Sequence, residues 1–169
     1  MTNFKLGKIV QLGLVLILGA TVQTVFAHDV TGTLLTGQGS RATDYYRIDC
    51  SLDQTAASQS PTHHLGFSVN DGTATGGVLN AQVTTTLSGG SIGRAAIVTD
   101  IKGGDGVSSV TEIVNTLNYT NVNSSPQDVS FFASVSKSAK SNKNYVLTYH
   151  CQDEFGQHTG TNITQLQNQ

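Results

Sequence analysis

The sequence predicts an all-β protein with a single antiparallel β-sandwich of about eight strands, preceded by a cleaved N-terminal signal peptide. Apolar and β-branched residues recur with a period of two through most of the chain after residue 27, as in strands with one buried face. Turn-forming residues separate these runs, for example at Asn70-Asp71-Gly72, which suits a tight hairpin. The chain contains two cysteines, and an even number also fits an exported domain with one disulfide.

The first 27 residues have the three parts of a secretory signal peptide. Lys5 and Lys8 form a basic segment, residues 9–20 form an apolar segment, and Val25-Phe26-Ala27 places small residues at −3 and −1. The apolar run is shorter than the roughly 20 residues that a membrane span needs. We therefore expect cleavage after Ala27, no membrane span in the mature form, and a periplasmic or extracellular location.

The mature chain is expected to form one domain over residues 28–164, with a polar, frayed tail at 165–169. The segment 109–119 is ambiguous, because its pattern fits either a strand or a capped helix; its β-branched residues favour the strand. In chain order, the other expected strands are Val30–Thr36, Tyr45–Cys50, Leu65–Asn70, Gly77–Leu87, Ala95–Ile101, Val129–Ser136, Tyr145–Gln152 and Thr159–Thr164.

The charge balance argues against nucleic acid as a partner. Without the two lysines of the signal peptide, 7 of the 9 basic residues remain against 11 acidic ones, which gives a net charge of −4 with neutral histidines. A nucleic-acid-binding surface needs a basic patch to contact phosphates. The surface is expected to be rich in hydroxyl and amide groups, which suits self-association or binding to another protein or a glycan.

Cys50 and Cys151 are expected to form one disulfide between two core strands. Alternation places each cysteine on the apolar face of its strand, so His150 should point away from the core. Tyr149-His150-Cys151 has a tyrosine two residues before the second cysteine, which resembles the tyrosine corner of immunoglobulin-like sandwiches. The resemblance implies an immunoglobulin-like architecture, although the chain has no tryptophan and its cysteines lie further apart than in that family.

Cleavage after Ala27 would make His28 the first residue of the mature protein. Its free amino group and its imidazole can then chelate one metal ion, and His150 or His158 could supply a further nitrogen. Three such nitrogens suit Cu(II), an arrangement similar to the histidine brace of copper carriers and lytic polysaccharide monooxygenases. His63 and His64 are adjacent, so strand geometry predicts that at most one of them serves a given site.

Other motifs carry less weight. Gly89-Gly90-Ser91-Ile92-Gly93 matches the GxSxG pattern of a hydrolase nucleophile elbow, but it is better explained as a glycine-rich turn between strands. Residues 100–106 contain two aspartates that could hold Ca²⁺, without the spacing of a known calcium loop.

No catalytic residue is therefore predicted. The leading hypothesis is an exported, non-catalytic β-sandwich that acts as a surface, structural or binding module. The alternative is a periplasmic or secreted copper-binding protein, and less favoured still is a copper redox enzyme.

Overall fold

The computed structural model describes residues 28–51, 60–74, 76–85, 96–115 and 129–169. The expected signal peptide at 1–27 and the GxSxG motif at 89–93 lie outside the described residues.

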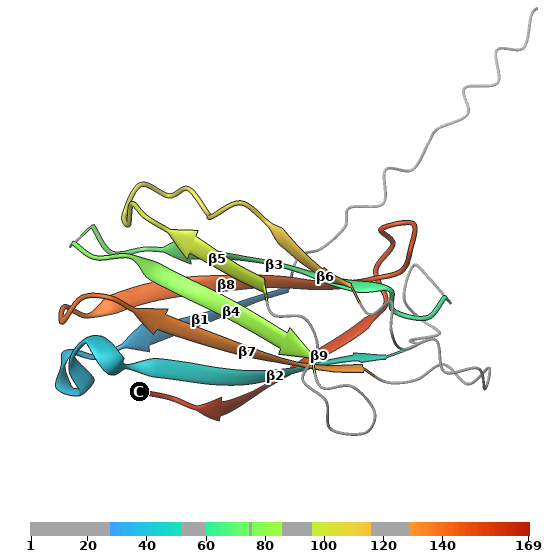
Figure 1. Cartoon of the computed structure of the whole chain (residues 1–169), viewed down its shortest axis with the longest axis horizontal. Coiled ribbons are helices and arrows are strands. Elements are labelled where there is room, and N and C mark those ends of the chain that lie inside the picture. Colours follow the sequence, from blue (N-terminus) through green and yellow to red (C-terminus); the bar gives the residue numbers. More distant parts are fainter. Residues whose placement is uncertain (1–27, 52–59, 75, 86–95, 116–128) are drawn as a thin grey trace, which may run out of the picture.

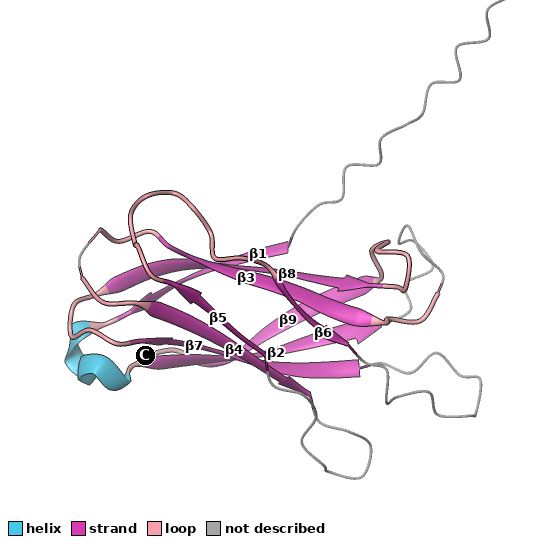
Figure 2. Ribbon diagram, turned by 45° about the horizontal axis from the view of Figure 1, so that its top comes forward, coloured by secondary structure: helices cyan, strands magenta, loops and turns pink. Residues whose placement is uncertain are grey.

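Two antiparallel sheets pack face to face in a sandwich-like arrangement (Figures 1 and 2). Sheet A has four strands, in the order β1 (His28–Leu34), β8 (Lys143–Gln152), β3 (His64–Asp71) and β6 (Glu112–Asn115). Sheet B has five, in the order β5 (Ala96–Asp100), β4 (Leu79–Thr85), β7 (Val129–Lys137), β2 (Thr43–Ser51) and β9 (Gly160–Gln167). The all-β prediction is confirmed, and β6 shows that part of the ambiguous segment is a strand.

One apolar core lies between the sheets. Strict alternation of buried and partly exposed residues along β7 and β8 produces it, because every second side chain points inward. Cys50 of β2 and Cys151 of β8 are fully buried in this core and form the predicted disulfide, with Cα atoms 5.7 Å apart. The disulfide therefore links sheet A to sheet B.

The chain crosses between the sheets where a hairpin was expected. β3 belongs to sheet A and β4 to sheet B, so the hairpin predicted at Asn70-Asp71-Gly72 is wrong. The reason is a buried ion pair: the carboxylate of Asp71 contacts Lys143 Nζ at 2.5 Å, and both side chains are inaccessible to solvent. Asp71 thus faces the interior and does not form part of a two-residue turn.

Residues near the C-terminus are held against the domain instead of fraying. β9 continues to Gln167, beyond the expected end at Thr164. The backbone N–H of Gln169 donates to a carboxyl oxygen of the buried Asp44 at 2.6 Å, and its carbonyl accepts from Leu35 N at 3.2 Å. Polar composition predicted fraying, but these tertiary hydrogen bonds prevent it.

A short 3₁₀ segment at Thr36–Arg41, which the sequence did not predict, connects β1 to β2. Among the described residues no helix is long and apolar enough to cross a membrane.

Candidate metal site at the start of β1

Three histidines that are distant in sequence meet at one end of sheet A. His28 is the first residue of β1 and pairs with Tyr149 of β8. His150 is the next residue of β8, and His158 follows the turn after this strand. A bridge between Gln152 and His158 returns the chain to the edge of β8 that β1 also occupies. The fold therefore collects imidazoles from the start of one strand, the end of its neighbour and the turn beyond.

The distances between these rings are short. His150 Nδ1 lies 3.0 Å from His158 Nε2, and the two rings are nearly perpendicular, at 89°. The ring of His28 is stacked on that of His158 with a centroid distance of 5.9 Å, and it also lies 5.8 Å from the ring of Tyr149. The structure thus brings together all three of the residues that the sequence suggested as metal ligands.

Burial and mutual proximity favour the neutral form of two of these imidazoles. Desolvation lowers the pKa of His150, and the nearby His158 and His28 lower it further. The pKa of His158 is also lowered, first by desolvation and then by His28. A neutral imidazole carries the lone pair that a metal ion requires.

The spacing between the two closest nitrogens suits shared coordination. Two ligands at about 2.0 Å from one ion, separated by an angle between 90° and tetrahedral, are roughly 2.8–3.3 Å apart. The 3.0 Å between His150 Nδ1 and His158 Nε2 falls inside this interval. A hydrogen bond between one protonated and one unprotonated ring nitrogen also gives this distance, so an ion would take the place of the shared proton.

The site is not completely preformed. Within the described ranges, no group of three or more histidine, cysteine, aspartate or glutamate side chains has the geometry of a finished metal site. The His28 ring stacks on His158 and does not point with it toward a common centre. His28 is exposed, however, so its side chain can turn without disrupting the core.

Two segments, β1 and the segment that contains His158, lie along the same edge of β8, and the mature N-terminus would lie between them. His28 pairs opposite Tyr149, whereas Thr159 N donates to Cys151 O at 3.0 Å on the same edge. The backbone nitrogen of His28 therefore lies at the boundary between β1 and the segment that contains His158. A free amino group at this point would be next to the histidine cluster.

The second pair of histidines occupies the same end of sheet A. His63 Nδ1 and His64 Nδ1 are 3.2 Å apart, and His64 Nε2 lies 3.0 Å from Gln152 Oε1. The two rings thus lie next to each other and do not point to opposite faces as strand alternation predicted, whereas the number of them that serves a given site stays a prediction. The physical reason is that His63 precedes β3, where strand alternation does not apply.

Asp100 and Asp105, the two aspartates considered as Ca²⁺ ligands in residues 100–106, have other partners in the structure. Asp100 accepts hydrogen bonds from the backbone N–H groups of Asp71 and Lys102. Asp105 accepts from Val107 N and lies 3.7 Å from Lys102 Nζ. These carboxylates stabilise the turn through backbone amides and a lysine.

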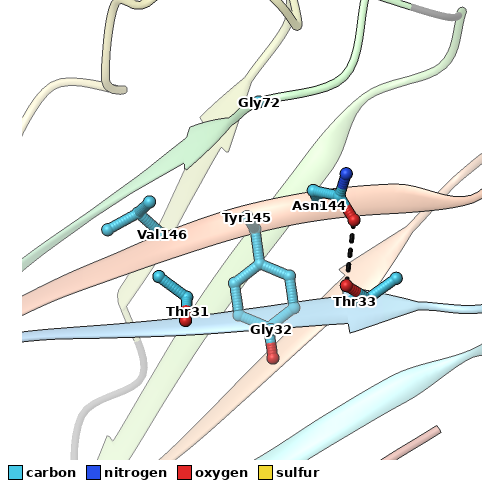
Figure 3. A pocket seen from close by; sticks show the side chains of 7 residues that line it. All are labelled: Thr31, Gly32, Thr33, Gly72, Asn144, Tyr145 and Val146. Atoms are coloured by element: carbon cyan, nitrogen blue, oxygen red, sulfur yellow. Dashed lines mark hydrogen bonds between the residues drawn. The ribbon is translucent and has the colours of Figure 1, made fainter.

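A shallow cavity of about 360 Å³ lies over the second half of β1 and the start of β8 (Figure 3). Its lining is mostly apolar and is formed by Thr31, Gly32, Thr33, Gly72, Asn144, Tyr145 and Val146, and Thr33 donates to Asn144 at 2.9 Å. It lacks the histidines and has no acid, base or nucleophile arranged for catalysis. The histidine cluster is therefore the better candidate site.

Comparison with protein-family models, with curated proteins and with solved structures gave no match.

Proposed function

We propose that the mature protein is an exported copper-binding protein. The metal would be held by the amino group and imidazole of His28 together with the imidazoles of His150 and His158. The observation that carries this proposal is the proximity of these three rings, with the nitrogens of His150 and His158 only 3.0 Å apart.

Copper fits this donor set better than other common metals. The ligands would all be nitrogen, which suits Cu(II) in a square-planar arrangement, and Cu(II) is also the tightest binder among first-row divalent ions. Calcium and magnesium prefer oxygen ligands. The lowered pKa values of His150 and His158 support binding at neutral pH, because no proton has to be displaced from a cationic ring.

The number of nitrogens favours binding or transfer over catalysis. The His28 amino group and three imidazoles would together occupy all four positions of a square plane. A copper redox enzyme needs an open position for its oxidant, as catalytic metal sites generally do. We therefore favour a carrier or storage role over the redox enzyme.

The proposal rests on export and processing. The interior disulfide fits an oxidising compartment, and cleavage after Ala27 would free the amino group of His28. The broader hypothesis of a surface or binding module with a protein, glycan or self-association partner remains a prediction, and copper binding is compatible with it.

Copper titration tests the proposal with four proteins. The first is mature protein that begins at His28; the second has one extra alanine before it, which blocks the chelating amine. The third and fourth are His150→Ala and His158→Ala. Thr31→Ala, an exposed substitution on β1, is the matched control.

We expect each of the three changes to weaken Cu(II) binding by at least about 100-fold, above the roughly 10–100-fold loss typical of outer ligand partners. The control should bind as the mature protein does. Electron paramagnetic resonance should show four equatorial nitrogens in the mature protein. Equal affinities in all of these proteins would overturn the proposal.

A further inference from the structure

We infer that His63 and His64 form a second transition-metal site, which neighbours the first and does not depend on the N-terminus. The inference begins from the distance between the two Nδ1 atoms, 3.2 Å. This value lies in the interval of roughly 2.8–3.3 Å that two nitrogens adopt when they bind one ion at about 2.0 Å. The rings are nearly perpendicular, at 88°.

Gln152 determines which nitrogen of His64 carries the proton. The side-chain amide of Gln152 donates through Nε2 to the carbonyl of Gly156 at 3.0 Å, so its oxygen faces His64. An amide oxygen only accepts hydrogen bonds, and therefore His64 Nε2 must be the donor. In a neutral ring this leaves the lone pair on Nδ1, directed toward His63.

This arrangement is typical of a metal-binding histidine. Such residues donate their second ring N–H to a carbonyl or carboxylate, which sets the tautomer and the ring orientation. The pair thus presents one oriented lone pair and a second imidazole nitrogen at ligand spacing.

The position on the sheet places the two sites side by side. His64 pairs with Gln152 across β3 and β8, while His150 pairs with Gly66. His150 and Gln152 are two residues apart on β8, so their side chains share the outer face and are separated by roughly 7 Å along the strand. Gly66 has no side chain to separate the two histidine groups.

Two protein ligands, with water completing the coordination, should bind more weakly than the four nitrogens of the first site. We therefore expect two Cu(II) ions per mature chain, with distinct affinities. The second ion should show fewer nitrogen ligands by electron paramagnetic resonance.

The experiment uses Cu(II) alone and separates the two sites by substitution. His63→Ala and His64→Ala should each remove the weaker binding step and leave the stronger one. Combined replacement of His28, His150 and His158 by alanine should remove the stronger step and leave the weaker one. Failure of the first site would therefore not conceal the second.

Gln152→Leu tests the role of the amide while both histidines remain. It should weaken the second step by about 10–100-fold, the cost typical of losing an outer ligand partner. Gln82→Leu, an exposed glutamine of β4 in sheet B, is the matched control and should have no effect. Nitrogen-15 spectra of metal-free protein should show the proton of His64 on Nε2.

Absence of any copper-binding step that is lost in both His63→Ala and His64→Ala would overturn the inference, whether or not the first site binds copper. So would a second step that survives both His63→Ala and His64→Ala, or a His64 ring protonated on Nδ1 alone. Circular dichroism of each variant checks that the fold is retained, and Gln152→Leu remains informative if either histidine variant fails to fold.

Discussion

Gly32 of β1 tolerates no side chain, because the ring of the neighbouring Tyr145 occupies the space that a Cβ at position 32 would need (Figure 3). A methyl group at position 32 would lie 2.7 Å from Tyr145 Cε1 and closer still to the end of the ring. Ordinary carbon contacts are about 3.5–4.0 Å, so the ring or the strand would have to move by roughly 1 Å. Gly32→Ala therefore forces a rearrangement at the edge of sheet A.

The cost follows from what holds the Tyr145 ring in place. Its hydroxyl lies 2.5 Å from the buried carboxyl of Asp44 and 2.6 Å from the hydroxyl of Tyr46. A displacement of about 1 Å stretches these contacts to the limit of hydrogen bonding. Losing one such bond, and leaving a buried partner unsatisfied, costs about 1–3 kcal/mol, and overpacking costs a similar amount. We expect Gly32→Ala to lower the free energy of unfolding by about 2–4 kcal/mol.

Urea denaturation of the metal-free protein measures this loss, and Gly37→Ala supplies the control. Gly37 does not have a positive φ, and a methyl group there would meet no atom within 4 Å. Its substitution should change the free energy of unfolding by less than about 0.5 kcal/mol. A loss below about 1 kcal/mol for Gly32→Ala, or equal losses for both variants, would refute the reasoning.

Three further predictions concern the interior and the histidines. Replacing both Cys50 and Cys151 by alanine should lower the free energy of unfolding by at most about 4–5 kcal/mol, since the disulfide closes a loop of about 100 residues. Thiol titration of the denatured wild-type protein should find no free thiol, and two reactive thiols would contradict the disulfide. Lys143→Met should cost about 3–5 kcal/mol in thermal or urea unfolding, because it leaves a buried carboxylate unpaired, and an unchanged stability would contradict this. The pKa values of His150 and His158 are lowered in the folded protein, so the unfolded chain binds more protons near pH 6.5. The free energy of unfolding of the metal-free protein should therefore be constant well above pH 6.5 and fall as the pH drops through this value. Urea midpoints measured across this range, which should flatten when both histidines are replaced by alanine, test the linkage.

The strand pattern could be predicted from the sequence because alternation is a local property. Apart from Lys137 and Lys143, each inward-facing residue of β7 and β8 is apolar or aromatic, and this periodicity is visible without knowledge of the partner strand. The disulfide was predictable for a similar reason, since only two cysteines are present and both fall on apolar faces.

The crossing after β3 could not be predicted, because it depends on a partner distant in sequence. Asn70-Asp71-Gly72 has the local chemistry of a hairpin, but Asp71 is drawn into the interior by Lys143, 72 residues further along the chain. Likewise, the polar end of the chain becomes ordered because Asp44 and Leu35 bind the backbone of Gln169. Such long-range hydrogen bonds leave no local pattern.

By itself, the sequence determined which residue types were available: five histidines after residue 27, two cysteines, and segments in which apolar residues alternate as in strands. Only the tertiary structure decided which histidines meet. The pairing of β1 with β8, and the return of the chain at Gln152 and His158, bring His28 to the other two. The physical reason is that strand register aligns backbone groups across the sheet through hydrogen bonds, so residues more than 100 positions apart become neighbours, whereas periodicity records only the face on which each residue lies.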